Sequence, residues 1–147
     1  MMEINEPARL VALIVQEAHD AIIMADREGI IRFWNQGAEI VFGFSPAEAI
    51  GQSLHIIIPE NLRERHDQGY CQVMESGRSK YSHELLAVPA LKKDGRRISV
   101  EFSMTLIREQ QGRILGAAAI IRDVSARWEK ERALKRRLAE LEAQVKP

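Results

Sequence analysis

The sequence predicts an α+β domain, and two kinds of pattern predict it. Residues 98–106 alternate apolar and polar side chains as a half-buried strand does, whereas residues 6–19 and 59–77 repeat their apolar side chains at helical spacing. Polar turns that contain glycine, such as "DREG" and "KKDGRR", separate the segments. The resulting order is one helix, two strands, several short helices, three strands and a charged helix.

The first two predicted elements are an amphipathic helix and a hairpin. Pro7 is a favourable first helical residue, and apolar residues follow it at helical spacing, which predicts a helix over about 6–19. Its apolar surface is broad and requires a covering partner. The stretch "AIIMADREGIIRFWN" consists of two short apolar runs around a turn, where Gly29 provides a permissive backbone, so we expect a β-hairpin.

Two short helices are predicted next from their capping residues. Asn35 can cap a helix over "QGAEIVFGF". In "SPAEAIGQ", Ser45 is a cap, Pro46 is a first helical residue, Glu48 completes a capping box and Gly51 ends the helix.

A longer helix is predicted for "PENLRERHDQGYCQVMESG", which begins with proline and ends with glycine. Leu62, His66, Tyr70 and Val73 lie at positions i, i+4, i+8 and i+11, which is one face of a helix.

The segments after this helix predict three strands. "KYSHELLAVPAL" is a candidate strand that we expect to be broken or bulged near Pro89, because proline cannot donate to a strand ladder. "ISVEFSMTLI" alternates, and "ILGAAAIIRDVS" is a final apolar strand. The residues of the alternating segment expected to face one side are Ile98, Val100, Phe102, Met104 and Leu106.

From Ser125 onward the chain is polar and helical, with an apolar seam formed by Leu134, Leu138, Leu141 and Val145. Their spacing is that of a coiled coil, which favours a homodimer, although an amphipathic tail packed on its own domain would show the same pattern. We therefore divide the chain into a flanking helix (1–19), a central domain (20–124) and a C-terminal helix (125–147).

The composition limits the classes of function. The 147 residues contain 21 Lys and Arg against 21 Asp and Glu, a balance that argues against nucleic-acid binding. The single cysteine, Cys71, permits no internal disulfide and suits a reducing compartment. No apolar run is long enough to span a membrane, and the N-terminus lacks the features of a signal peptide, so we expect a cytoplasmic protein.

Four segments carry a family resemblance: "GIIRFWNQGAEIVFGFSPAEAIGQSL", "IIPENLRERH", "KKDGRRISVEFSM" and "GAAAIIRDVSARWEKE", which together cover about residues 15–130. In this order and spacing, the chain resembles a PAS domain of the S-box type. The resemblance implies a five-stranded antiparallel sheet, short helices on one face and a pocket between them for haem, flavin, small metabolites or nothing. It also implies dimerisation through the N-terminal flanking helix and a C-terminal signalling helix.

The segment "RERHD" is most similar to haem-binding oxygen sensors of the FixL type, in which an equivalent helix carries the histidine that ligates the haem iron. The resemblance therefore implies a gas or redox sensor with haem b as cofactor and His66 as metal ligand. Gly69 would let a flat macrocycle approach the helix closely. The other expected cofactor-binding residues are Leu62, Tyr70, Val73, Leu86, Phe102 and Met104. Met104 is an iron ligand or, more commonly for this residue type, a core residue.

Two departures from the FixL pattern leave alternatives open. Those sensors have a distal arginine on the strand before the "DG" turn, where this chain has "HELLAVPAL", and their tyrosine follows the histidine by three residues rather than four. His66 would then be a half-exposed helix residue, with Arg63 and Asp67 paired across one turn. In that case the pocket binds another small molecule or no cofactor, and the domain is a dimerisation or interaction scaffold.

No segment of the sequence indicates catalysis, because it contains no phosphate-binding loop and no nucleophile motif. His19, His55 and His83 show no ligand spacing, so we expect structural or exposed roles for them. Cys71 lies outside the "NCRFLQ"-like context of a light-sensing flavin domain. The charged C-terminal helix fits a free-standing domain or a sensor that continues into an effector, and its downstream partner is unknown.

Overall fold

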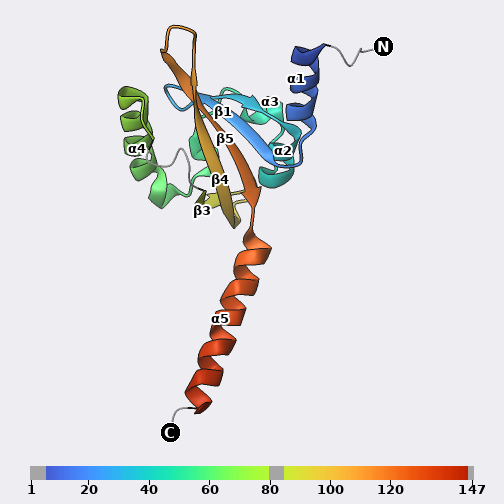
Figure 1. The fold of residues 1–147 in the computed structure, drawn as a ribbon, viewed down its shortest axis with the longest axis vertical. Coiled ribbons are helices and arrows are strands. Elements are labelled where there is room, and N and C mark those ends of the chain that lie inside the picture. Colours follow the sequence, from blue (N-terminus) through green and yellow to red (C-terminus); the bar gives the residue numbers. More distant parts are fainter. Residues whose placement is uncertain (1–5, 80–84, 146–147) are drawn as a thin grey trace.

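The computed structural model describes residues 6–79 and 85–145, and it confirms the α+β architecture. Five antiparallel strands form one sheet in the order β2-β1-β5-β4-β3 (Figure 1). Neighbours in the sheet include β1 and β5, which are the first and last strands of the chain. The strands are β1 (Ala21–Asp26), β2 (Ile31–Trp34), β3 (Leu86–Leu91), β4 (Arg97–Arg108) and β5 (Ile114–Asp123).

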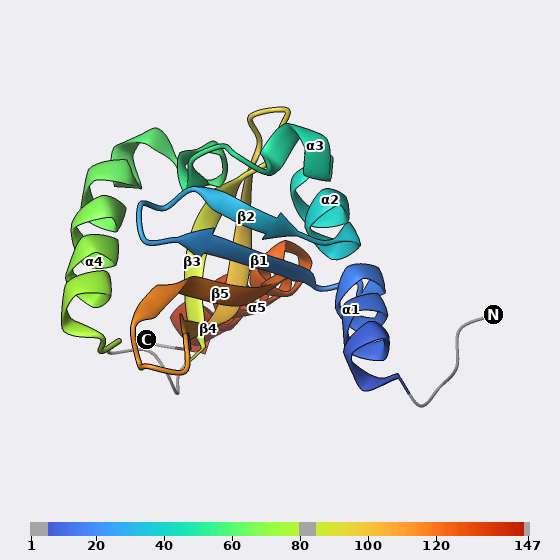
Figure 2. The same ribbon diagram turned by 90° about the horizontal axis from the view of Figure 1, so that it is seen from above.

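Helices cover one face of the sheet and lie toward opposite sides of it (Figure 2). The α2 and α3 helices lie at the side where β1 begins and β2 ends, whereas α4 lies at the other side, near the turn that joins the two strands. These elements are α2 (Gln36–Phe42), α3 (Pro46–Ala49), the 3₁₀ turns η1 (Leu54–Ile57) and η2 (Glu60–Leu62), and α4 (Arg63–Ser76).

The predicted helix caps are present. Asn35 Oδ1 accepts a hydrogen bond from the Ala38 N–H at 2.9 Å and caps α2. Ser45 and Glu48 form the reciprocal capping box at α3. The long predicted helix differs at its start, because the residues before Arg63 form η2 rather than the first turn of α4. The side-chain caps of Asn35 and Ser45 thus determine where α2 and α3 begin, whereas no such cap precedes α4.

The strands after α4 confirm one prediction and correct another. The even-numbered side chains of β4 face the helices: Val100 is buried in the core with Phe102 packed against its cluster, and Met104 packs against a second buried cluster around Met74. Pro89, in contrast, neither breaks nor bulges β3, which pairs continuously with β4 and matches Pro89 with Ser99. Because β3 is an edge strand, the proline nitrogen, which carries no hydrogen, can lie on the side that has no neighbouring strand. The start of the predicted strand lies outside the described residues.

The core beneath the helices consists of two apolar clusters. The larger surrounds Trp34 and Phe42, which are buried with Ile31 between the sheet and α2. The smaller joins Met74 of α4 to Ile114 and Ala117 of β5. The helix α4 thus contacts the sheet mainly near its C-terminal half.

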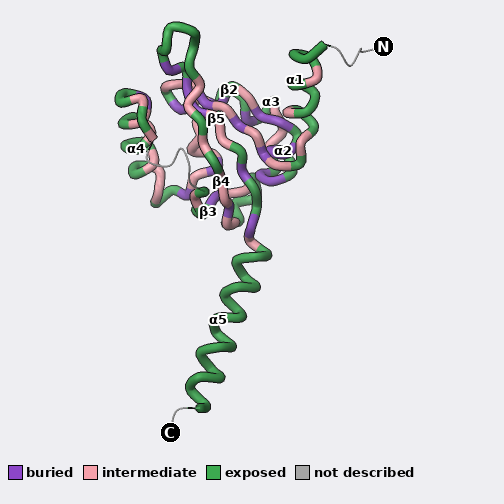
Figure 3. Tube along the Cα trace, viewed as in Figure 1, coloured by how far each residue is buried: buried purple, intermediate pink, exposed green. Residues whose placement is uncertain are grey.

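The two terminal helices are α1 (Pro7–Glu17) and α5 (Ser125–Val145). Neither contains a buried residue, and α5 extends away from the sheet with its described length exposed (Figure 3). The α1 helix is shorter than the predicted 6–19 and leaves Val11 and Ile14 largely exposed. Within the described ranges, no helix has the length and apolar character needed to cross a membrane.

Candidate functional site

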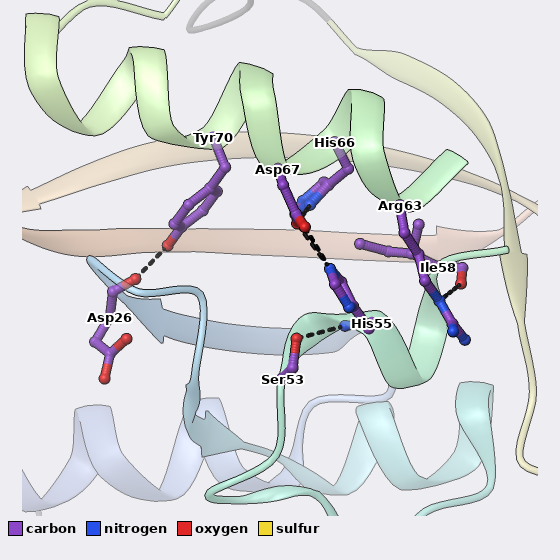
Figure 4. A network of polar contacts seen from close by, with 8 residues as sticks. All are labelled: Asp26, Ser53, His55, Ile58, Arg63, His66, Asp67 and Tyr70. Atoms are coloured by element: carbon purple, nitrogen blue, oxygen red, sulfur yellow. Dashed lines mark hydrogen bonds and ion pairs between the residues drawn. The ribbon is translucent and has the colours of Figure 1, made fainter. Parts of the chain in front are cut away.

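The site is centred on His66, which lies near the start of α4 and points toward the body of the domain (Figure 4). Its side chain is 32% exposed. The imidazole stacks on Tyr70 one turn later, with 5.7 Å between ring centroids and 24° between ring planes. The predicted helix face therefore brings these two side chains together.

Tyr70 fixes α4 to the end of β1. Its hydroxyl donates to the backbone carbonyl oxygens of Asp26 at 2.6 Å and Ala25 at 3.2 Å. Burial raises the pKa of Tyr70 to about 12, so the hydroxyl remains a donor throughout the neutral range. This contact holds the turn of α4 that follows His66 at the end of β1.

A second histidine, His55 of η1, for which we expect a structural or exposed role, lies beside Asp67 of α4. Its Nε2 lies 2.7 Å and 2.8 Å from the two carboxylate oxygens. Ser53 supports this arrangement by accepting a hydrogen bond from the His55 backbone N–H. The hydrogen bond from His55 lowers the pKa of the Asp67 carboxyl below its ordinary value.

Asp67 also lies beside His66, but burial has the larger effect on the pKa of the imidazole. The distance from His66 Nδ1 to the nearer carboxylate oxygen is 3.4 Å. Burial is the largest influence on the pKa of His66 and lowers it below the ordinary 6.5, against the opposing effect of Asp67. Burial therefore favours the neutral form of His66, and a neutral imidazole is the form that binds metals.

The expected pair between Arg63 and Asp67 is not formed. Arg63 Nε donates instead to the carbonyl oxygen of Ile58 at 3.1 Å, while Asp67 turns to His55. Sequence reasoning missed the contact with His55, because the two residues are twelve positions apart in different helical segments. Only the packing of η1 beside α4 brings them together (Figure 4).

A cleft of about 380 Å³ opens between α4, η1 and the turn that joins β1 to β2. Its lining surface is more apolar than polar, and it comprises residues 27–29 and 53–55 together with His66, Asp67, Tyr70 and Cys71. Of the eight expected cofactor-binding residues, it therefore contains only His66 and Tyr70.

The apolar members of the expected site lie deeper and are half-buried. Val73 and Met104 pack in the smaller core cluster, and Phe102 packs against the larger one. Leu86 is paired in register with Phe102, and Leu62 is the last residue of η2. Val73 and Met104 thus lie between α4 and the sheet, and none of these five side chains lines the cleft.

Gly69 lies on the exposed side of α4. A Cβ atom at this position would meet nothing within 4 Å. No contact among the residues that the structure describes therefore requires glycine here.

The donor set fits haem better than a bare metal ion. In the described part of the chain, no group of three or more His, Cys, Asp or Glu side chains is arranged to hold a metal. Haem iron needs a single axial histidine from the protein, because the macrocycle supplies the other nitrogens. His66 fits this role, since a carboxylate beside Nδ1 is the usual partner of a ligating imidazole and leaves Nε2 for the metal.

Comparisons with known proteins agree with this fold. Residues 9–124 match the family model described as the PAS fold. The sensor protein FixL of Bradyrhizobium diazoefficiens is 46% identical over 54 residues, which is 37% of this chain and 11% of FixL. The signal transduction histidine-protein kinase AtoS of Escherichia coli is 29% identical over 131 residues, which is 89% of this chain and 20% of AtoS.

A solved structure shows the same architecture. The PAS domain of a protein from Colwellia psychrerythraea matches 82% of this chain and 99% of its own, with a TM-score of 0.72 and 25% identity. The chain spans about a fifth or less of the length of the curated relatives it matches.

Proposed function

This chain belongs to the PAS family, and on that premise we propose that it is a sensor domain that binds a small ligand or cofactor. We infer a binding role rather than catalysis, and a relay of the signal through the flanking helices of a homodimer. Gas or redox sensing through haem b is the specific function that we favour.

One observation carries the haem proposal: the half-buried imidazole of His66, whose Nδ1 lies 3.4 Å from the Asp67 carboxylate. Haem would supply an iron centre that binds gases or changes oxidation state. His66 would hold the group on α4 and Asp67 would orient the imidazole. Apolar contacts from Phe102 and Met104 would require these side chains to leave their packing in the core. The resemblance of "RERHD" to FixL-type sensors supports the same assignment.

Titration of the purified protein with haemin tests this assignment. We expect a Soret band at one equivalent that is lost in His66→Ala and restored by added imidazole. His19→Ala is the matched control, because His19 is an exposed histidine outside the site. A protein that takes up no haemin, or a His66→Ala variant that binds it equally well, would contradict the proposal.

Gly69 provides a separate test of how the macrocycle would approach α4. Gly69→Ala should stabilise the helix by about 0.5–1 kcal/mol, because nothing lies near the added methyl group. If the macrocycle lies against this part of α4, the same variant binds haemin more weakly. Unchanged haemin affinity would show that the macrocycle does not contact this position.

The exposed seam of α5 supports the relay. Leu134, Leu138 and Leu141 are 61%, 57% and 42% exposed, so the described part of their own domain does not cover them. Pairing with the same helix of a second copy would bury them. Sedimentation analysis should show a dimer that Leu138→Asp disrupts, whereas Ala143→Asp, on the opposite helix face, has little effect. If both variants dissociate equally, the leucine seam is not the contact that holds the dimer together.

The second candidate is a scaffold without a cofactor. It is favoured by the contact of Met104 with the α4 side chains in the smaller core cluster, because internal packing reduces the space left for a ligand. A dimer that takes up no haemin would support this function.

A further inference from the structure

The coiled-coil pattern of α5 extends closer to the sheet than its leucines do. Counted back from Leu134, the same alternation of three and four residues continues through Glu131 and Arg127 to Val124. Two charged residues therefore occupy the seam in its first two turns. A charge at such a position lowers the stability of a helix pair unless it has a partner.

These seam charges have partners on β4 and within α5. The Arg127 guanidinium forms an ion pair with Glu101 of β4, and its Nε lies 3.8 Å from a carboxylate oxygen of Glu131. Glu101 is 22% exposed, so this carboxylate is more shielded than the other two groups. The three side chains form a network that joins the sheet to the start of the helix.

Hydrogen bonds from the same part of β4 fix the beginning of α5. The Ser99 N–H donates to Ser125 Oγ at 2.8 Å, and the Val124 N–H donates to the Ser99 carbonyl at 2.8 Å. Glu101 follows Ser99 by two residues and shares its face of the strand. Its neighbour Phe102 points the other way, into the site side of the sheet. A shift of β4 at the site thus moves both the start of the helix and the carboxylate that holds Arg127.

We propose that Glu101 couples the sheet to helix pairing by holding Arg127 out of the dimer seam. This inference rests on the proposed α5 dimer, with the two helices parallel. In such a pair, each seam residue faces its own copy, so two released Arg127 side chains would repel each other. With Glu101 in place, the guanidinium stays at the sheet and the pair forms from Leu134 onward, beyond both seam charges. Displacement of Glu101 returns the charge to the seam and loosens the first turns.

A double-mutant cycle on the full chain tests the coupling by sedimentation equilibrium. We expect Glu101→Gln to weaken the dimer about three- to tenfold, because it releases Arg127. Arg127→Leu should tighten it by placing an apolar residue in the seam. In the Arg127→Leu background, Glu101→Gln should have no further effect. Glu129→Gln is the matched control, since this exposed glutamate lies on the helix face away from the seam.

The outcomes separate this inference from the dimer itself. No change in dimer affinity in Glu101→Gln, or an equal change with and without Arg127, overturns the coupling while the seam remains. A dimer that is insensitive to Leu138→Asp overturns the seam. Spin labels at position 133 in a Cys71→Ser background add a structural measurement: the distribution of distances between copies should broaden in Glu101→Gln and narrow in Arg127→Leu.

Discussion

Truncating the buried side chain of Asn35 should strongly destabilise the domain. Asn35 is completely buried and lies at the junction of β2 and α2. Its Oδ1 accepts from the backbone N–H groups of Ile22 at 2.8 Å and Ala38 at 2.9 Å. Its Nδ2 donates to the carbonyl oxygens of Val15 at 2.8 Å and Asp20 at 3.0 Å. The one amide thus joins α1, β1 and α2.

The expected cost of Asn35→Ala follows from these partners. A lost N-cap costs about 1 kcal/mol, and each further buried backbone group left without a partner costs about 1–3 kcal/mol. Allowing for water that enters the vacated space, we expect a loss of about 3–5 kcal/mol in the free energy of unfolding. Since a domain of this size is stable by only about 5–15 kcal/mol, the variant should be close to unfolded at physiological temperature.

Urea unfolding followed by far-UV circular dichroism measures this loss. Gln36→Ala is the control, because Gln36 is an exposed amide in the next position, and it should change stability by less than about 0.5 kcal/mol. Asn35→Asp adds a second comparison, because it keeps the acceptor oxygen but places a carboxylate against carbonyl groups. Its deficit should shrink as the pH falls and the carboxyl becomes protonated. A loss below about 1 kcal/mol in Asn35→Ala would refute the reasoning.

Three further predictions concern helix α2, the site and pH. Gly37→Ala should destabilise the domain by more than about 2 kcal/mol in the same urea assay, because its Cβ would lie 2.0 Å from the Asp20 carbonyl oxygen. Tyr70→Phe should lose about 1–2 kcal/mol and increase hydrogen exchange in α4, since the hydroxyl contact with Asp26 is removed. The His66 ring should titrate below 6.5 by NMR. Because its folded pKa is lowered, it contributes stability above pH 6.5 that is lost as the pH falls through the folded pKa, and a His66→Gln variant should lack this loss.

The sequence alone determined the elements whose causes are local. The capping box of Ser45 and Glu48 and the Asn35 cap depend on residues three positions apart, so their signals can be read from the chain. The alternation in β4 identified Phe102 and Met104 as inward-facing for the same reason. The face of α4 that carries His66 and Tyr70 also follows from helical spacing.

Tertiary structure decided the features that join distant segments. Pro89 remains within a regular strand because β3 lies at the edge of the sheet, a position that no local signal reveals. The pairing of His55 with Asp67 depends on η1 lying beside α4, and the hold of Glu101 on Arg127 depends on β4 lying beside the start of α5. Short-range hydrogen bonding and periodicity determine elements, whereas contacts between elements depend on how their apolar faces pack together. The sequence therefore made His66 a candidate ligand, and only the fold showed that the Asp67 carboxylate lies beside both His66 and His55.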